Sequence, residues 1–115
     1  MSYLVSIFSY TEKGKQVAKE ISTLDLSKFR DEKIEIYIEE SNDITEEIFN
    51  NRDAIIFVSA TGIAIRKIAP FINSKLTDPA VIVIDECKNF VIPILAGHIG
   101  GFFYINFDFL ISKFW

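Results

Sequence analysis

The segment Ile55-Ile56-Phe57-Val58-Ser59-Ala60-Thr61-Gly62 decides the fold class of this chain. Its first four residues form a continuous, largely β-branched apolar run, which is typical of a strand covered on both faces. Thr61 can cap a helix that follows directly, and Pro70 should end or kink that helix because proline lacks the backbone N–H for the next hydrogen bond. The inner face of this helix is predicted to carry Ile65, Ile68 and Ala69. A buried strand followed at once by an amphipathic helix indicates an α/β protein.

The chain before this segment repeats the alternation of strand and helix. Leu4-Val5-Ser6-Ile7-Phe8 is predicted as a buried first strand, and apolar residues at helical spacing over 17–24 predict an amphipathic helix that covers the sheet. Isoleucines alternate with other side chains over 34–39, which predicts a strand with one wet face near the sheet edge. Asp43 followed by Glu46 resembles a helix N-cap with its reciprocal acid.

The chain after this segment supplies the last two strands. Thr77-Asp78-Pro79 is predicted as a turn into the apolar run 81–84. The segment 85–89 is short enough for a hairpin, so 90–95 should pair antiparallel with that run, and Pro93 should lie at an edge or a bulge. The order of elements predicts an α/β fold with a mixed, mostly parallel sheet of about five strands and helices on both faces, in three layers.

A candidate site follows the last predicted strand, at Gly97-His98-Ile99-Gly100-Gly101. Its three glycines leave a bare backbone that a ligand can approach closely, and His98, the single histidine, can donate a hydrogen bond, shuttle a proton or ligate a metal. A helix beginning near Gly100 would direct its N–H groups at a carboxylate or phosphate. We expect this loop to meet Thr61-Gly62 along one edge of the sheet, with Arg66 as a clamp for a carboxylate. The structural alternative is a glycine turn with a locally bonded histidine, a capping threonine and an arginine that faces water.

Other polar residues have simpler structural interpretations. Asp78 before Pro79 is predicted to form a turn. Asp85 and Glu86 could act as paired carboxylates in acid–base chemistry, but a solvated hairpin is the expected role. Cys87 is the single cysteine, which excludes an intramolecular disulfide and a cysteine-based metal cluster.

Composition narrows the class of protein. The chain has 115 residues, is 50% hydrophobic and has a formal net charge of -4, which favours one globular domain and disfavours a nucleic-acid-binding surface. It contains no GxGxxG, P-loop, HExxH or GxSxG motif. It has no basic n-region of a signal peptide, and no apolar stretch approaches the ~20 residues of a membrane helix. We therefore expect a cytoplasmic protein without membrane or nucleic-acid partners.

Four stretches of the chain together carry a specific combination of motifs. They are Ala60-Thr61-Gly62-Ile63-Ala64-Ile65-Arg66, Ile68-Ala69-Pro70, Thr77-Asp78-Pro79-Ala80-Val81 and Val91-Ile92-Pro93-Ile94-Leu95-Ala96-Gly97-His98-Ile99-Gly100-Gly101. In this combination the chain resembles the N-terminal domain of the cobalamin-biosynthesis protein CbiG. The similarity is dense over residues 55–101, whereas before residue 50 only the strand–helix–strand pattern agrees.

The resemblance implies hydrolysis of cobalt-precorrin-5A in the anaerobic route to vitamin B12, in which a δ-lactone of the macrocycle opens and acetaldehyde is released. Our own hypothesis from the residues is that His98 is catalytic and activates water or assists the fragmentation as a general acid or base, while the identity of the catalytic base stays open. The candidate substrate-binding residues are Thr61, Gly62, Arg66, Gly97, Gly100 and Gly101. Cobalt would arrive inside the substrate, so no cofactor and no protein-held metal is expected.

The chain departs from this family in two respects. The family continues into a linking segment and a C-terminal domain, so we expect this domain to be poorly active alone, and either to pair with that missing domain or to form a homo-oligomer. Residues 1–101 form the family-like domain, whereas 102–115 form an atypical aromatic tail, which we interpret as an aberrant ending or a natural truncation. Two other functions stay open: a non-catalytic α/β module that binds an anionic small molecule or a partner subunit, and a generic phosphate-binding fold.

Overall fold

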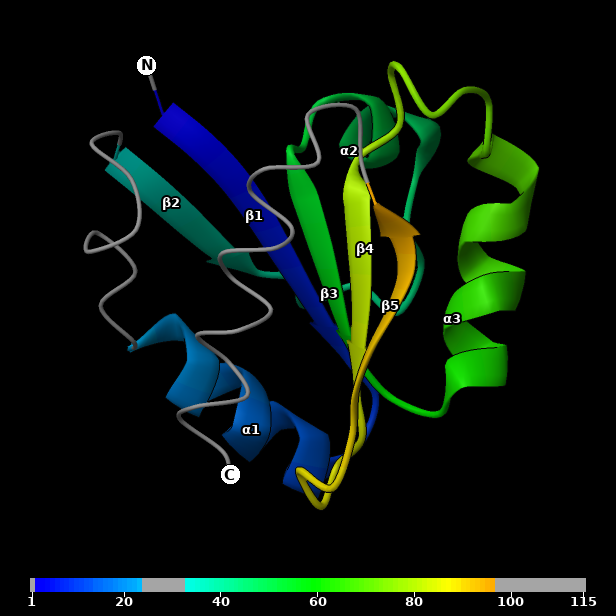
Figure 1. Ribbon diagram of the computed structural model, residues 1–115. Coiled ribbons are helices and arrows are strands. Elements are labelled where there is room, and N and C mark those ends of the chain that lie inside the picture. The colour runs from blue at the N-terminus through cyan, green and yellow to red at the C-terminus, as the bar shows by residue number, and fades with distance from the viewer. Residues whose placement is uncertain (1, 24–32, 97–115) are drawn as a thin grey trace.

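A computed structural model of the chain describes residues 2–23 and 33–96 (Figure 1). The elements follow the predicted order, with strands wherever apolar runs are continuous or alternate and helices wherever the apolar spacing is helical. The elements are β1 Ser2–Ser9, α1 Glu12–Ser22, β2 Lys33–Ile38, α2 Glu46–Asn50, β3 Ala54–Val58, α3 Thr61–Ile68, a 3-10 helix Ala69–Phe71, β4 Ala80–Ile84 and β5 Val91–Ala96.

The five strands form one sheet in the order β2-β1-β3-β4-β5, in which the first four strands are parallel and β5 is antiparallel to β4. Val58 at the end of β3 pairs with Ser9 of β1 on one side and with Ile84 of β4 on the other. We call this side of the sheet the carboxyl edge, and the opposite side, where β3 and β4 begin, the amino edge. The predicted mixed and mostly parallel sheet is confirmed.

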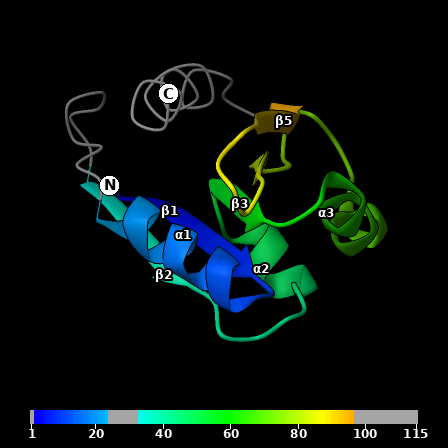
Figure 2. The same cartoon turned by 90° about the horizontal axis from the view of Figure 1, so that it is seen from below.

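Helices cover both faces of the sheet, as predicted. In β3, alternate side chains point to opposite faces and every residue is buried, which explains its unbroken apolar sequence. One face packs against α1, and the other packs against α2 and α3. Figure 2, which looks onto the carboxyl edge, shows α1 and α3 on opposite sides of β3. The helical residues buried in the two layers are Val17, Ala18 and Ile21 of α1, Phe49 of α2, and Ala64 and Ile68 of α3.

Two predicted helix caps are wrong by one or two residues. Thr45, and not Asp43, caps α2, because its side chain accepts a hydrogen bond from the backbone N–H of Ile48 at 3.2 Å. Ala60 is the N-cap of α3, without a side-chain cap bond, and Thr61 is the first helical residue. An extended backbone at Ala60 is enough to start this helix, so the hydroxyl of Thr61 is not used for capping.

The inner face predicted for α3 is only partly correct. Ile68 is buried, together with Ala64 one turn earlier, but the side chain of Ile65 is 47% exposed and Ala69 is exposed. Each residue turns the helix by about 100°, so a helix of this length buries one narrow stripe, and Ile65 lies beside it. Pro70 lies in the 3-10 helix that ends α3, as predicted.

The predicted hairpin joins β4 and β5 at the carboxyl edge. Its turn is held by the Asp85 carboxylate, which accepts hydrogen bonds from the backbone N–H groups of Cys87 at 3.2 Å and Phe90 at 2.7 Å. Lys88 has a positive φ of 61° in this turn. The register of β5 shifts opposite Val81 and Ile82, next to Pro93, so the proline lies at an edge strand and at a bulge, as its missing N–H requires.

Candidate functional site

The topological switch point of the sheet lies between β1 and β3. The chain leaves β1 toward α1 on one face, whereas it leaves the neighbouring β3 toward α3 on the other face. In open α/β sheets, ligands bind outside the carboxyl ends of the strands at such a point. The connections that follow β1 and β3 are therefore where a ligand site is expected.

The first turn of α1 lies directly against the end of β3. Thr11 caps the helix by accepting a hydrogen bond from the backbone N–H of Gly14 at 2.9 Å. A Cβ added to Gly14 would lie 3.2 Å from the hydroxyl oxygen of Thr11 and 3.4 Å from the carbonyl oxygen of Val58. Gly14 thus allows a close approach of helix to strand, and it brings the two connections of the switch point side by side.

The start of α3 has a different surrounding. A Cβ added to Gly62 would meet no atom within 4 Å, so neither packing nor a positive φ requires glycine at this position. No acidic side chain lies in the first turn of α3, and its N-cap makes no side-chain bond. The positive end of the helix dipole therefore meets no described side-chain cap, and it favours an anion.

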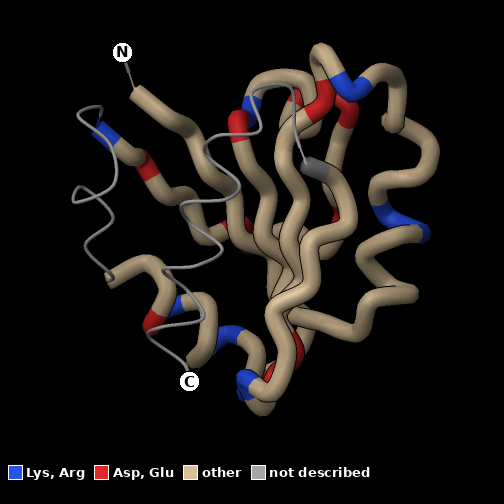
Figure 3. The backbone as a smooth tube through the Cα atoms, viewed as in Figure 1, with Lys and Arg blue, Asp and Glu red and all other residues tan. Residues whose placement is uncertain are grey.

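Arg66 of α3 is exposed, and within the described ranges no carboxylate forms an ion pair with it. Its neighbour Lys67 instead forms an ion pair with Asp43. Thr61, Gly62 and Arg66 thus lie together on α3, with the two former residues at the carboxyl edge, as the sequence predicted. Figure 3 shows basic and acidic positions interspersed along the described chain.

β5, the strand that precedes the predicted glycine–histidine loop, ends at the amino edge of the sheet. Ala96, the last residue of β5, pairs with Ala80 at the start of β4, which in turn pairs with Ala54 at the start of β3. The chain therefore reaches the amino edge at Ala96, about 13 Å along the strands from the level of Val58, where β3 ends. Because β5 is antiparallel, β3 and β5 end at opposite edges of the sheet. His98, Gly97, Gly100 and Gly101 lie outside the described residues.

Two of the other carboxylates have structural roles, as predicted. The buried Asp78 accepts hydrogen bonds from the backbone N–H groups of Asn73 at 2.9 Å and Ser74 at 3.1 Å, and so forms the turn before β4. Asp85 organises the hairpin. Between residues 2–23 and 33–96, no three His, Cys, Asp or Glu side chains converge into a possible metal site.

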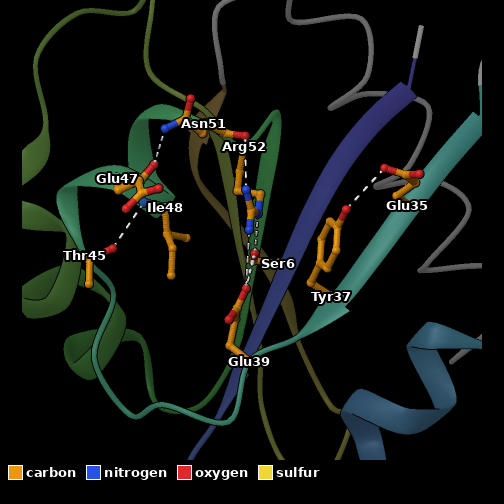
Figure 4. A network of polar contacts seen from close by, with 9 residues as sticks. All are labelled: Ser6, Glu35, Tyr37, Glu39, Thr45, Glu47, Ile48, Asn51 and Arg52. Atoms are coloured by element: carbon orange, nitrogen blue, oxygen red, sulfur yellow. Dashed lines mark hydrogen bonds and ion pairs between the residues drawn. The ribbon is translucent and has the colours of Figure 1, made fainter.

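A polar cluster between β1, β2 and the start of β3 was not predicted (Figure 4). Ser6, which is completely buried, donates a hydrogen bond to the Glu39 carboxylate at 2.8 Å and accepts one from Arg52 Nε at 2.7 Å. The Arg52 guanidinium also lies 4.8 Å from the centre of the Tyr37 ring. These contacts join β1, the end of β2 and the start of β3, so the cluster anchors the edge strand β2 to the sheet.

Tyr10 is the residue at the switch point that sequence reasoning missed. It follows the last residue of β1, and burial, with a smaller contribution from the charge of Asp43, raises its pKa to about 12. Lys67 of α3 lies over its ring, with Nζ 5.7 Å from the ring centroid. Its position could be recognised from the sequence only after the strand order had shown that β1 neighbours β3.

Lys13, near the start of α1, contacts the β4–β5 hairpin, which Figure 1 shows beside that end of the helix. Its ammonium donates a hydrogen bond to Cys87 Sγ at 3.1 Å, and this bond raises the pKa of Lys13. Lys88 forms a second contact between the same elements, an ion pair with Glu20 at 2.9 Å. Both contacts are exposed, so they contribute little to stability.

None of the described helices has the length and apolarity needed to cross a membrane.

The amino-acid sequence of this chain is similar to those of curated cobalt-precorrin-5A hydrolases. The cobalt-precorrin-5A hydrolase of Salmonella typhimurium is 40% identical over 103 residues, and the match covers 84% of this chain and 29% of that protein. The cobalt-precorrin-5A hydrolase of Priestia megaterium is 29% identical over 108 residues, with 84% of this chain and 29% of that protein covered. This chain therefore spans less than a third of the length of these curated relatives.

A solved structure shares the fold. The crystal structure of a cobalamin biosynthesis protein G homologue from Sulfolobus solfataricus superposes on this chain with a TM-score of 0.69 at 29% sequence identity. The superposition covers 96% of this chain and 34% of the homologue. The family model for the cobalamin synthesis G N-terminal domain matches residues 43–102, just over half of the chain. The chain therefore belongs to the cobalamin synthesis G N-terminal family.

Proposed function

We propose that this chain is the N-terminal domain of a cobalt-precorrin-5A hydrolase, an enzyme of cobalamin biosynthesis, and that it works in the cytoplasm. The observation that carries the proposal is the 40% identity to the Salmonella typhimurium cobalt-precorrin-5A hydrolase over most of this chain. The reaction proposed is opening of the δ-lactone of a cobalt tetrapyrrole with release of acetaldehyde. Cobalt enters as part of the substrate, and the proposal requires no cofactor held by the protein.

The carboxyl edge supports a binding role in this reaction. A tetrapyrrole precursor that carries several carboxylates suits the positive end of α3, where Thr61 and Gly62 have no side-chain cap. Gly62 has no atom within 4 Å of the place where its side chain would stand, so a ligand can approach the backbone closely there. Arg66, exposed and without a described carboxylate partner, can bind a substrate carboxylate through two N–H groups.

We keep His98 as the proposed catalytic residue, with Gly97, Gly100 and Gly101 as binding residues beside it. The family match extends to residue 102 and so includes all four. The division of the chain into a family-like domain over 1–101 and an additional segment over 102–115 stays a proposal. Since β5 ends at the amino edge, the roles of Thr61-Gly62 and of His98 need separate tests.

Binding is tested by titrating the chain with cobalt-precorrin-5A and following the visible absorbance of the macrocycle. Arg66→Ala should weaken binding about tenfold, because a charge-assisted hydrogen bond is lost at a partly solvated site. Lys75→Ala is the matched control, since Lys75 is an exposed cation in the loop that leads back to the amino edge. Equal affinities of the two variants would contradict the role of Arg66.

Catalysis is tested by release of acetaldehyde from the same substrate. His98→Ala should abolish release without abolishing the absorbance change. A second candidate function is binding without turnover, which the short span of this chain relative to its relatives favours. In that case the chain shifts the absorbance but releases acetaldehyde only when a C-terminal domain from a relative is added. No absorbance change at micromolar protein would overturn both proposals.

A further inference from the structure

Tyr10 carries a hydroxyl group that the fold does not use. Its oxygen is buried, yet no hydrogen-bond partner is found for it, and it is the one such side-chain atom within the described residues. The ring packs partly against the core on the α2–α3 face. A phenylalanine would fill the same space without burying an unpaired polar group, so folding alone does not explain the hydroxyl.

The position of Tyr10 connects this hydroxyl with the switch point. Tyr10 directly follows Ser9, which pairs with Val58 at the end of β3, so it lies beside the connection that leads into α3. Lys67 lies about two turns into that helix, with its ammonium 5.7 Å from the centre of the Tyr10 ring. The backbone of Tyr10 therefore lies at the carboxyl edge, and its ring lies beside Lys67 in the last turn of α3.

Lys67, the cation that lies over the Tyr10 ring, already forms an ion pair with a carboxylate of this chain. Lys67 forms its ion pair with Asp43, whose side chain is 77% exposed, whereas that of Lys67 is 31% exposed. Asp43 lies in the connection between β2 and α2, which also starts at the carboxyl edge. An ion pair with one largely exposed partner exchanges readily with other anions, because solvent screens it.

We propose that Tyr10 is a ligand-binding residue, whose phenol donates a hydrogen bond to a carboxylate of the acidic substrate while that carboxylate replaces Asp43 at Lys67. This inference rests on the proposed function. A carboxylate offers two oxygens, so it can accept from the ammonium and from the phenol at the same time. Asp43 is then a placeholder that neutralises Lys67 in the absence of substrate.

The protonation state of Tyr10 suits this role. Burial and the nearby Asp43 raise the pKa of Tyr10 to about 12, so the phenol keeps its proton at neutral pH and acts as a donor. The substrate carboxylate supplies the acceptor that the fold lacks.

The test compares Tyr10→Phe with Tyr37→Phe in the absorbance titration with cobalt-precorrin-5A at neutral pH. Tyr37 is the matched control, because it is a tyrosine of the edge strand β2 whose hydroxyl bonds Glu35. Tyr10→Phe should weaken binding about tenfold, whereas Tyr37→Phe should bind as the unmodified chain does. Urea unfolding should show that Tyr10→Phe is at least as stable as the unmodified chain, which separates lost binding from lost structure.

A second variant tests the placeholder. Asp43→Asn should tighten binding severalfold, because Lys67 no longer has a competing carboxylate. The control ligand is a cobalt tetrapyrrole whose side-chain carboxylates are converted to amides. Neither Tyr10→Phe nor Asp43→Asn should change the affinity for this ligand. If Tyr10 and Asp43 had only a structural role, the two substitutions would change the affinity for both ligands alike. If the unmodified chain binds cobalt-precorrin-5A and Tyr10→Phe binds it equally well, the role of Tyr10 is refuted while the proposed function stands. If the unmodified chain does not bind, the proposed function fails first, and this inference fails with it.

Discussion

The two glycines of the described helices should respond in opposite ways to the same substitution. Alanine in place of a helical glycine gains roughly 0.5–1 kcal/mol, because the unfolded chain loses conformational freedom. At Gly62 the added Cβ meets nothing within 4 Å, so Gly62→Ala should realise this gain. For a chain of this length, 1 kcal/mol corresponds to roughly 4 °C in Tm.

At Gly14 the same methyl group meets its surroundings. It would lie 3.2 Å from the capping oxygen of Thr11, 3.4 Å from the carbonyl oxygen of Val58 and 3.5 Å from Cβ of Ser9. The carbonyl belongs to a buried strand and cannot retreat, and displacement of Thr11 loses an N-cap worth about 1 kcal/mol. The propensity gain is then offset or exceeded, so Gly14→Ala should be neutral to about 1 kcal/mol destabilising.

Urea unfolding followed by far-UV circular dichroism measures both variants. The free energies of unfolding should differ by about 0.5–2 kcal/mol in favour of Gly62→Ala. The same Gly62→Ala protein should bind cobalt-precorrin-5A more weakly, because the methyl group occupies the space through which the ligand approaches. If Gly14→Ala stabilises the fold as much as Gly62→Ala does, the reasoning about the contact between α1 and β3 is refuted.

Three further outcomes are expected. Ser6→Ala should lower the free energy of unfolding by about 1–2 kcal/mol in urea titrations, because it leaves Glu39 and Arg52 without their shared hydroxyl; an unchanged midpoint would contradict this. Thr45→Ala should cost about 1 kcal/mol by the same measurement through loss of the α2 cap, and a stable variant would show that the cap is dispensable. The pKa of Tyr10 is raised from its ordinary value near 10 to about 12, so the unfolded chain releases this proton first and stability falls as the pH rises from 10 to 12. Tyr10→Phe should show a smaller loss in thermal melts over this range, and parallel curves for both proteins would refute the assignment.

The sequence predicted the order of the elements because each one has a strong local signal. Continuous apolar runs such as that of β3 are buried on both faces, and the alternation in β2 marks an edge strand. Helix starts were less predictable, because Asp43 and Thr45 are both able to cap a helix and only the position of the first turn decides between them. Thr61 was misplaced for a related reason, since an extended backbone at Ala60 can begin α3 without a side-chain cap.

The candidate site was predicted in part. Thr61, Gly62 and Arg66 could be recognised because the start of a helix after a parallel strand is a local feature. The antiparallel pairing of β5 was predicted, and it makes β5 end at the edge opposite to the end of β3, a consequence that the expected common edge did not take into account. Tyr10 could not be recognised, because its importance depends on the neighbourhood of β1 and β3, which is a long-range property of the strand order.

Because β5 is antiparallel, the connection after β4 at the carboxyl edge, the proposed binding edge, is a short hairpin. Each described connection at the carboxyl edge, after β1, β2, β3 and β4, re-enters the domain within a few residues and is held by a sheet or helix on both sides. Short spans fixed at both ends have few conformations to lose, so association with a ligand carries a small entropic penalty there. Affinity at this edge should therefore respond to individual side chains more than to loop rearrangement, which makes single substitutions informative probes of the proposed binding site.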